Sequence, residues 1–222
     1  MGVEVEVYVN PAAFRPDPPH GHVTLFPQLQ VINRVLGAAG LPPYLGPAGG
    51  QHLCLRIGSY STLSGLMHHM AELALGPRPL RPSYQDHLVA GYSEKYPDAE
   101  PVFQHVALHS DCDGYFVPLD FPRVLDGRDE QLVGRFLGSA VRVRAECEFL
   151  ADLYAFPLHR NPIPEELPGW PSHEDIWNRL YHIGSARYEW FAANDNGHLM
   201  TCAKLHYAAC YALQTQGLML FS

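Results

Sequence analysis

The sequence predicts one α/β or α+β domain over residues 1–222, with a small mixed sheet of about four strands and helices packed on it. The chain has 222 residues and no low-complexity linker that would divide it. Hydrophobic residues make up 47% and charged residues 17%, enough apolar surface for a folded core. Strand-like and helix-like patterns also alternate along the chain, which is typical of this fold class.

The first half shows two strands and two helices. Apolar and polar residues alternate over 3–9, which predicts a strand, and the proline-rich stretch 10–24 then predicts a surface connection. A helix is expected from about Pro27, ending at the glycine and proline residues of 37–43. Residues 53–57 form a short apolar run before apolar residues at helical spacing from Leu63 to Leu73, so we expect a strand, a tight turn and a helix.

The second half is punctuated by proline. The stretch 77–101 contains five prolines, and it is either a functional lid or a segment with a missed short element. Residue periodicity predicts five further elements: a strand at 102–109, a long helix at about 129–154 that Gly134 and Gly138 could divide, an aromatic-rich helix at 173–193, a helix from about His198 to Gln214, and a final buried strand. One more proline-rich loop, 157–171, separates the second of these elements from the third.

Charge and cysteine usage restrict the partners and the compartment. The formal charge is −8, from 15 basic and 23 acidic residues, and no basic run occurs, so nucleic acid is not expected as a partner. No apolar run approaches the roughly 18 residues that span a bilayer, so no membrane association is expected. The N-terminus lacks the pattern of a signal peptide, and five cysteines without a CxxC pair suit reduced thiols. We therefore expect a cytoplasmic location.

The stretch HSDCDGYFVPLD, residues 109–120, has the ligand spacing of an EF-hand calcium loop. The candidate metal ligands are His109, Asp111, Asp113, the carbonyl of Tyr115, and Asp120, with Gly114 at the sharp turn. The expected cofactor is one divalent cation, Mn²⁺, Zn²⁺, Mg²⁺ or Ca²⁺, or otherwise none. Because imidazole is a poor calcium ligand and suits transition metals, high calcium affinity is not expected.

A structural turn explains the same stretch without an ion. Asp111 and Asp113 would accept hydrogen bonds from backbone amides, and Gly114 would supply a positive φ. The loop follows a predicted strand where an EF-hand has a helix, so the turn is the favoured interpretation.

A family resemblance is carried by Ser59-Tyr60-Ser61, the run from His109 to Gly114, Pro118, and the terminal helix and strand. The sequence resembles a group of uncharacterised bacterial proteins in which a strand ends in an HSDCDG loop motif, over roughly residues 51–222. The resemblance implies a bacterial cytoplasmic protein and brings no activity with it.

Two functions are consistent with these patterns. The preferred one is a non-catalytic binding or regulatory protein with an unidentified protein partner, in which residues 109–120 form a turn or a low-affinity cation loop and the helix at 173–193 is the contact surface. The alternative is a metal-dependent hydrolase in which the same loop holds the ion, helped by His20, His22 or His105. No general base or nucleophile can be named from spacing, so the catalytic residues and the status as an enzyme are open.

Overall fold

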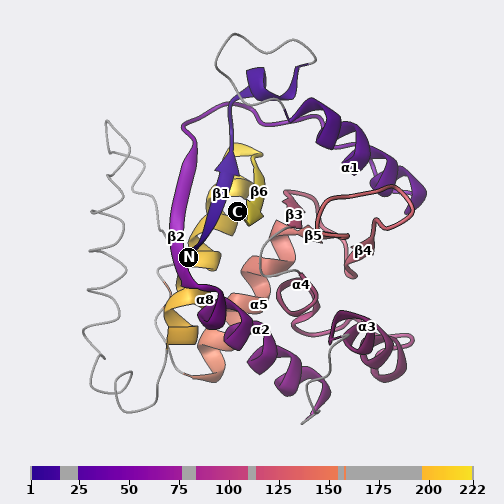
Figure 1. The fold of residues 1–222 in the computed structure, drawn as a ribbon, viewed down its shortest axis with the longest axis vertical. Helices are drawn as coiled ribbons and strands as arrows, with labels where there is room; N and C mark the ends of the chain where they lie inside the picture. Colours follow the sequence, from indigo (N-terminus) through magenta and orange to yellow (C-terminus); the bar gives the residue numbers. More distant parts are fainter. Residues whose placement is uncertain are drawn as a thin grey trace.

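The structure is a computed structural model that describes residues 2–15, 25–76, 84–109, 114–154, 158 and 197–221. The described elements follow in the order β1 (Gly2–Tyr8), η1 (Pro11–Phe14), α1 (Phe26–Ala38), β2 (Leu53–Ser59), α2 (Tyr60–Leu75), α3 (Tyr84–Lys95), α4 (Gln104–Ala107), β3 (Gly114–Val117), β4 (Leu125–Asp126), β5 (Phe136–Ser139), α5 (Ala140–Leu153), α8 (Gly197–Thr215) and β6 (Leu218–Phe221) (Figure 1).

The described strands form one six-stranded mixed sheet in the order β2-β1-β6-β3-β5-β4. β1 pairs antiparallel with both β2 and β6, and β6 pairs antiparallel with β3. β3 and β5 are parallel, and the short β4 pairs antiparallel with β5. The α/β or α+β class is therefore confirmed, but the expected number of about four strands was too low.

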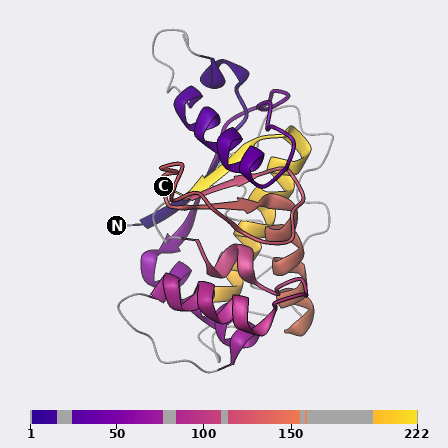
Figure 2. The same ribbon diagram turned by 90° about the vertical axis from the view of Figure 1, so that its right-hand side faces the viewer.

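Two hydrophobic clusters lie against the two faces of the sheet. The larger one joins the inward valines of β1 to α2, α4, α5 and α8, and it includes Phe116, Met219 and Phe221. The smaller one joins α1 and η1 to Tyr115, Val117 and Leu218 on the opposite face. Figure 2 shows α1 on one side of the sheet and most of the other helices on the other side. Because side chains alternate along a strand, β3 and β6 supply both clusters.

Several predicted elements lie close to the expected positions. β1 and β2 correspond to the strands expected at 3–9 and 53–57, and β6 to the strand expected at the C-terminal tail. The helices α1, α2 and α8 correspond to those expected from Pro27, over 63–73 and from His198. The four described cysteines are free thiols, as expected. The expected helix at 173–193 and most of the loop at 157–171 lie outside the described residues.

The strand predicted over 102–109 is wrong. Phe103 adopts a left-handed backbone conformation, with φ of 59°, and the four-residue helix α4 follows it. The helix predicted over 129–154 is also too long, because Gln131, Gly134 and Arg135 have positive φ angles and residues 136–139 form β5. The helix α5 begins only after Ser139, whose hydroxyl accepts the amide N–H of Arg142 at 3.2 Å.

The proline-rich stretch 77–101 contains a helix, so the interpretation as a missed element is the correct one for its later part. α3 covers Tyr84–Lys95 and carries the buried side chains Leu88 and Tyr92. The turn after α3 is held by Arg123, which donates to the carbonyls of Tyr96, Pro97 and Ala99.

Candidate functional site

Two histidines and one glutamate lie buried between α4, β5 and α5. The Glu146 carboxylate accepts the amide N–H groups of His105 at 2.8 Å and Val106 at 2.9 Å. It thus satisfies donors at the start of α4 that have no partner within the helix. His105 Nδ1 accepts the amide N–H of Ser139 at 3.0 Å, so these contacts join α4 to the junction of β5 and α5.

His109 lies at the end of this buried region, next to β3. Its ring packs against the Phe116 ring with centroids 3.9 Å apart and the planes tilted by 32°, and only 1% of the residue is exposed. A Cβ atom added to Gly114 or Gly138 would collide with the His109 ring, so the two glycines provide its space. Neither ring nitrogen has a hydrogen-bond partner in the part of the chain that the structure describes. Burial lowers the pKa of His109 to about 3, so the ring is neutral at pH 7.

The residues of the predicted metal site lie in different settings. Tyr115 is in β3 opposite Leu220, and Asp120 is exposed and paired with Arg142 at 2.6 Å. Asp111 and Asp113, like His20 and His22, lie outside the described residues. Within the described ranges, no group of three His, Cys, Asp or Glu side chains is arranged to hold a metal ion. The metal site at His109, Asp111, Asp113, Tyr115 and Asp120 stays a prediction.

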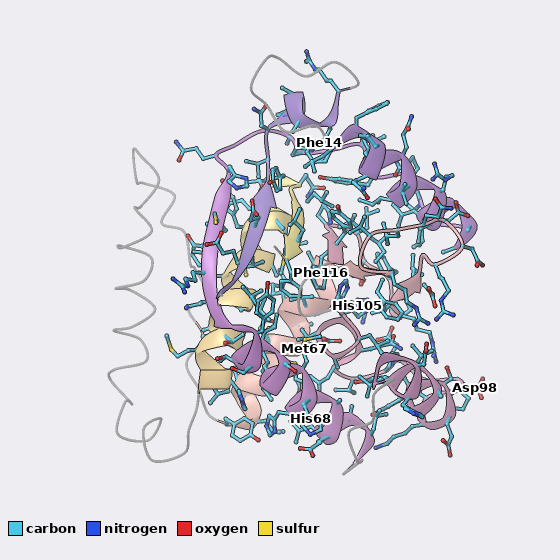
Figure 3. All side chains as sticks on the ribbon, viewed as in Figure 1. Phe14, Met67, His68, Asp98, His105 and Phe116 are labelled. Carbon is cyan, nitrogen blue, oxygen red and sulfur yellow. The ribbon has the colours of Figure 1, made fainter. Side chains whose placement is uncertain are left out.

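Carboxylates gather on a second region, which we call the acidic edge. It lies on α3, the turn after it and the segment 118–131, and α3 and β4 are on the same side of the molecule (Figure 1). In Figure 3, Asp98 is at the outer margin beside α3, whereas His105 and Phe116 are further inside. The acidic edge consists of Asp86, Glu94, Asp98, Glu100, Asp120, Asp126, Asp129 and Glu130.

Two arginines each bridge two carboxylates that are distant in sequence. Arg135 contacts Asp86 at 2.7 Å and Asp126 at 2.8 Å. Arg142 contacts Asp120 at 2.6 Å and Glu100 at 2.9 Å. These bridges hold α3 and the turn after it against the segment 118–131.

Single ion pairs add to this network. Arg128 contacts Asp86 at 3.1 Å, and Arg34 of α1 contacts Glu130 at 2.9 Å. The ammonium group of Lys95 instead donates to the carbonyl of Ala74. Among the described residues, Glu94, Asp98 and Asp129 have no cationic partner, so their charges are available to another molecule.

The bridges keep the central carboxylates ionised. Hydrogen bonding to Arg135 lowers the pKa of Asp86 below its ordinary value. Burial raises the pKa of Asp126, but its hydrogen bonds to Arg135 and to the Arg128 amide outweigh burial and lower it overall. Both groups therefore carry a negative charge at neutral pH.

The sequence interpretation did not include the acidic edge. Its acidic residues are spread over 86–130 and are separated by arginines, so they form no run of like charge. One feature of the sequence could have indicated the acidic edge: residues 84–100 contain four acidic residues and only one lysine or arginine. The other was the net charge of −8, which was used only to exclude nucleic acid as a ligand.

The comparison with known families gives one match. A family model with the description "Putative DNA-mimic protein" matches residues 1–221. No curated protein and no solved structure matches the chain. The match supports the expectation of an uncharacterised family, but it does not show that the HSDCDG motif is a feature of that family.

This match corrects two predictions. A family described by DNA mimicry overturns both the generic regulatory protein with a cation loop and its alternative, the metal-dependent hydrolase. It also corrects the partner prediction, because an unspecified protein partner without any relation to nucleic acid does not fit such a family.

Among the described helices, none combines the length and the apolar character needed to cross a bilayer.

Proposed function

We propose, from the premise that the chain belongs to this DNA-mimic family, that it occupies the DNA-binding surface of a DNA-binding protein. The observation that carries the proposal is the family match over residues 1–221. The acidic edge is the part of the described structure that we propose makes the contact. A cytoplasmic location belongs to the same proposal, since DNA-binding proteins of bacteria work there.

The physical requirement for a mimic is a dense array of fixed negative charge. Duplex DNA carries one negative charge per about 1.7 Å of helix axis, and proteins bind it mainly through lysine and arginine. The acidic edge offers eight carboxylates, of which Glu94, Asp98 and Asp129 lack a cationic partner among the described residues. A basic DNA-binding groove is therefore electrostatically complementary to this edge.

The arginine bridges suit this role because they position the carboxylates before binding. Arg135 and Arg142 each hold two carboxylates from separate segments, which restricts the side-chain rotamers that a partner would otherwise have to order. A partner's arginines can still bind Asp86 Oδ2 and Asp120 Oδ2, because the arginines contact only the Oδ1 atoms of these two carboxylates. This arrangement supports binding by a preformed surface.

The test is competition with DNA. A fluorescein-labelled duplex of 20 base pairs is bound to each of several purified proteins: a nucleoid protein, a helix-turn-helix repressor, a restriction endonuclease, a DNA glycosylase and a topoisomerase. The chain should lower the fluorescence anisotropy for at least one of them and leave the anisotropy of free DNA unchanged. Release from none of them, or binding of the chain to the free duplex, would contradict the proposal.

Variants assign the activity to the acidic edge. Asp98→Asn should raise the concentration for half-maximal release about threefold, and Glu94→Gln, Asp98→Asn and Asp129→Asn together about tenfold, because each removes attraction to a basic surface. Arg128→Gln removes a cation from the same edge and should act in the opposite direction. Glu4→Gln is the remote control, because a glutamine can still accept the Cys54 thiol that donates to Glu4 at 3.1 Å. Equal effects of Asp98→Asn and Glu4→Gln would show that the acidic edge is not the contact surface.

A further inference from the structure

The outer surface of α5 exposes two large apolar side chains. Phe149 is 49% exposed and Leu153 is 52% exposed. They are four residues apart on one helix, so their side chains are neighbours on the same face. Two such side chains side by side are more informative than one, because scattered apolar residues are ordinary on protein surfaces.

Carboxylates lie directly beside this apolar pair. Glu148 and Asp152 each precede one of the apolar residues, and they are also four residues apart, so they form a parallel column. The Glu148 carboxylate is 3.2 Å from His206 Nε2 of α8, whereas the Phe149 ring lies 5.4 Å from the ring of Phe103. The carboxylate column therefore faces α8 and the apolar column faces α4. We call these four residues the α5 patch.

The α5 patch adjoins the acidic edge. Arg142 lies on the same face of α5 as Phe149, seven residues or about two turns earlier, and it pairs with Glu100 and Asp120. Phe103, which contacts Phe149, comes three residues after Glu100. A partner seated on the acidic edge at Glu100 could thus reach Phe149 without leaving the surface.

We propose that the α5 patch is the docking site for an apolar surface that borders the DNA-binding groove of the same DNA-binding protein, an inference that rests on the proposed function. The carboxylate of Asp152, and that of Glu148, whose charge Arg144 partly offsets at 3.8 Å, continue the attraction that the partner's basic groove exerts on DNA. Phe149 and Leu153 add contacts that duplex DNA does not offer, and the exposed Phe149 ring can also accept an arginine over its face. The α5 patch therefore makes the chain selective for one DNA-binding protein over others whose DNA-binding grooves have a similar charge.

This division of roles follows from general properties of interfaces. Charged groups at the rim mainly accelerate association and exclude wrong partners, whereas a few buried aromatic or aliphatic side chains dominate affinity. DNA-binding grooves resemble one another in charge, so carboxylates alone give a mimic little selectivity. An apolar anchor beside the carboxylates supplies it.

The experiment uses the full chain and the DNA-binding protein from which the unsubstituted chain releases the labelled duplex. Phe149→Gln should raise the concentration for half-maximal release about tenfold and Leu153→Gln several-fold, since truncated anchors commonly cost this much. Leu45→Gln is the matched control, because Leu45 is 86% exposed and lies outside the patch, and it should change the value less than twofold. All three variants should melt within a few degrees of the unsubstituted chain.

The other outcomes are distinguishable. Release by the Phe149 and Leu153 variants at the same concentration as by the unsubstituted chain overturns the α5 patch and leaves the proposed function intact. Release by none of the chains overturns the proposed function itself. A lower melting temperature for Leu153→Gln but not for Leu45→Gln overturns the patch, because other residues of this chain would then cover it. A dimer in sedimentation velocity that Leu153→Gln dissociates assigns the surface to a second copy and also overturns it.

Discussion

Removal of the Glu146 carboxyl group should uncouple α4 from α5. In Glu146→Ala, the amides of His105 and Val106, which donate to the Glu146 side chain at 2.8 and 2.9 Å, lose their acceptor in a buried site. Each unsatisfied buried donor costs about 1–3 kcal/mol, and the removal of a buried polar carboxyl group offsets part of the sum. We therefore expect the free energy of unfolding to fall by about 3 kcal/mol, equivalent to about 6–12 °C in melting temperature.

The assay is urea unfolding followed by circular dichroism at pH 7, with Glu148→Ala as the control. Glu148 lies two residues after Glu146 on α5, but its carboxylate is exposed and contacts Arg144 at 3.8 Å and His206 at 3.2 Å. The exposed pair with Arg144 contributes less than about 1 kcal/mol, and the contact with the buried His206 adds about 1 kcal/mol, as one hydrogen bond does. An unfolding free energy for Glu146→Ala equal to that of Glu148→Ala would refute the capping role of Glu146.

The pH dependence gives an independent check of the same residue. Burial raises the pKa of Glu146 to about 8, although its amide hydrogen bonds act in the opposite direction. Because this pKa lies above the unfolded value, its contribution to stability is fully present below about pH 4.3 and is lost as the pH rises through about 8. The unfolding free energy of the unsubstituted chain minus that of Glu146→Gln should therefore decrease between pH 5 and 8. A flat difference would refute the raised pKa.

Three further predictions concern the buried histidine, its glycine neighbour and the salt response. Burial lowers the pKa of His109 to about 3, so its contribution to stability is present above the unfolded pKa and is lost as the pH falls from about 6.5. Relative to His109→Phe, the unsubstituted chain should lose about 2 kcal/mol between pH 7 and 5, and equal pH profiles would contradict this. Gly138→Ala should destabilise by about 1–3 kcal/mol in urea, because its Cβ would collide with Phe116 and lie 2.7 Å from His109 Nε2; Gly37→Ala, with open space at its Cβ, should not destabilise. Association with the DNA-binding protein, followed by stopped flow, should slow as salt rises from 50 to 300 mM, since screening weakens steering, and a salt-independent rate would exclude an electrostatic contact.

The sequence predicted the fold best where one periodicity continued over a whole element. Alternation in β1 and the apolar stripes of α1, α2 and α8 are local patterns, so they were readable without tertiary information. It failed between residues 102 and 139, where short elements depend on distant partners. The helix α4 is capped by Glu146, which is 40 residues away from Val106, and β5 is only four residues long and lies directly before α5. A local window cannot detect a cap supplied by another helix.

The acidic edge was not predicted because the net charge of −8 was used only as an argument against binding to nucleic acid. It was not considered as a feature that attracts basic proteins. An acidic chain repels nucleic acid, so the absence of a basic patch argues against a DNA ligand. The same charge attracts every protein whose surface is built to bind DNA, and a DNA mimic is the case in which both statements hold. Whether the charge is concentrated enough to matter depends on tertiary structure, because Arg135 and Arg142 bring together carboxylates that are up to 40 residues apart, as Asp86 and Asp126 are. Since each of these arginines neutralises one carboxylate and orders two, the edge keeps negative charge while losing side-chain freedom. The strength of a mimic of this kind therefore depends on the geometry of its few arginines as well as on the number of its acidic residues.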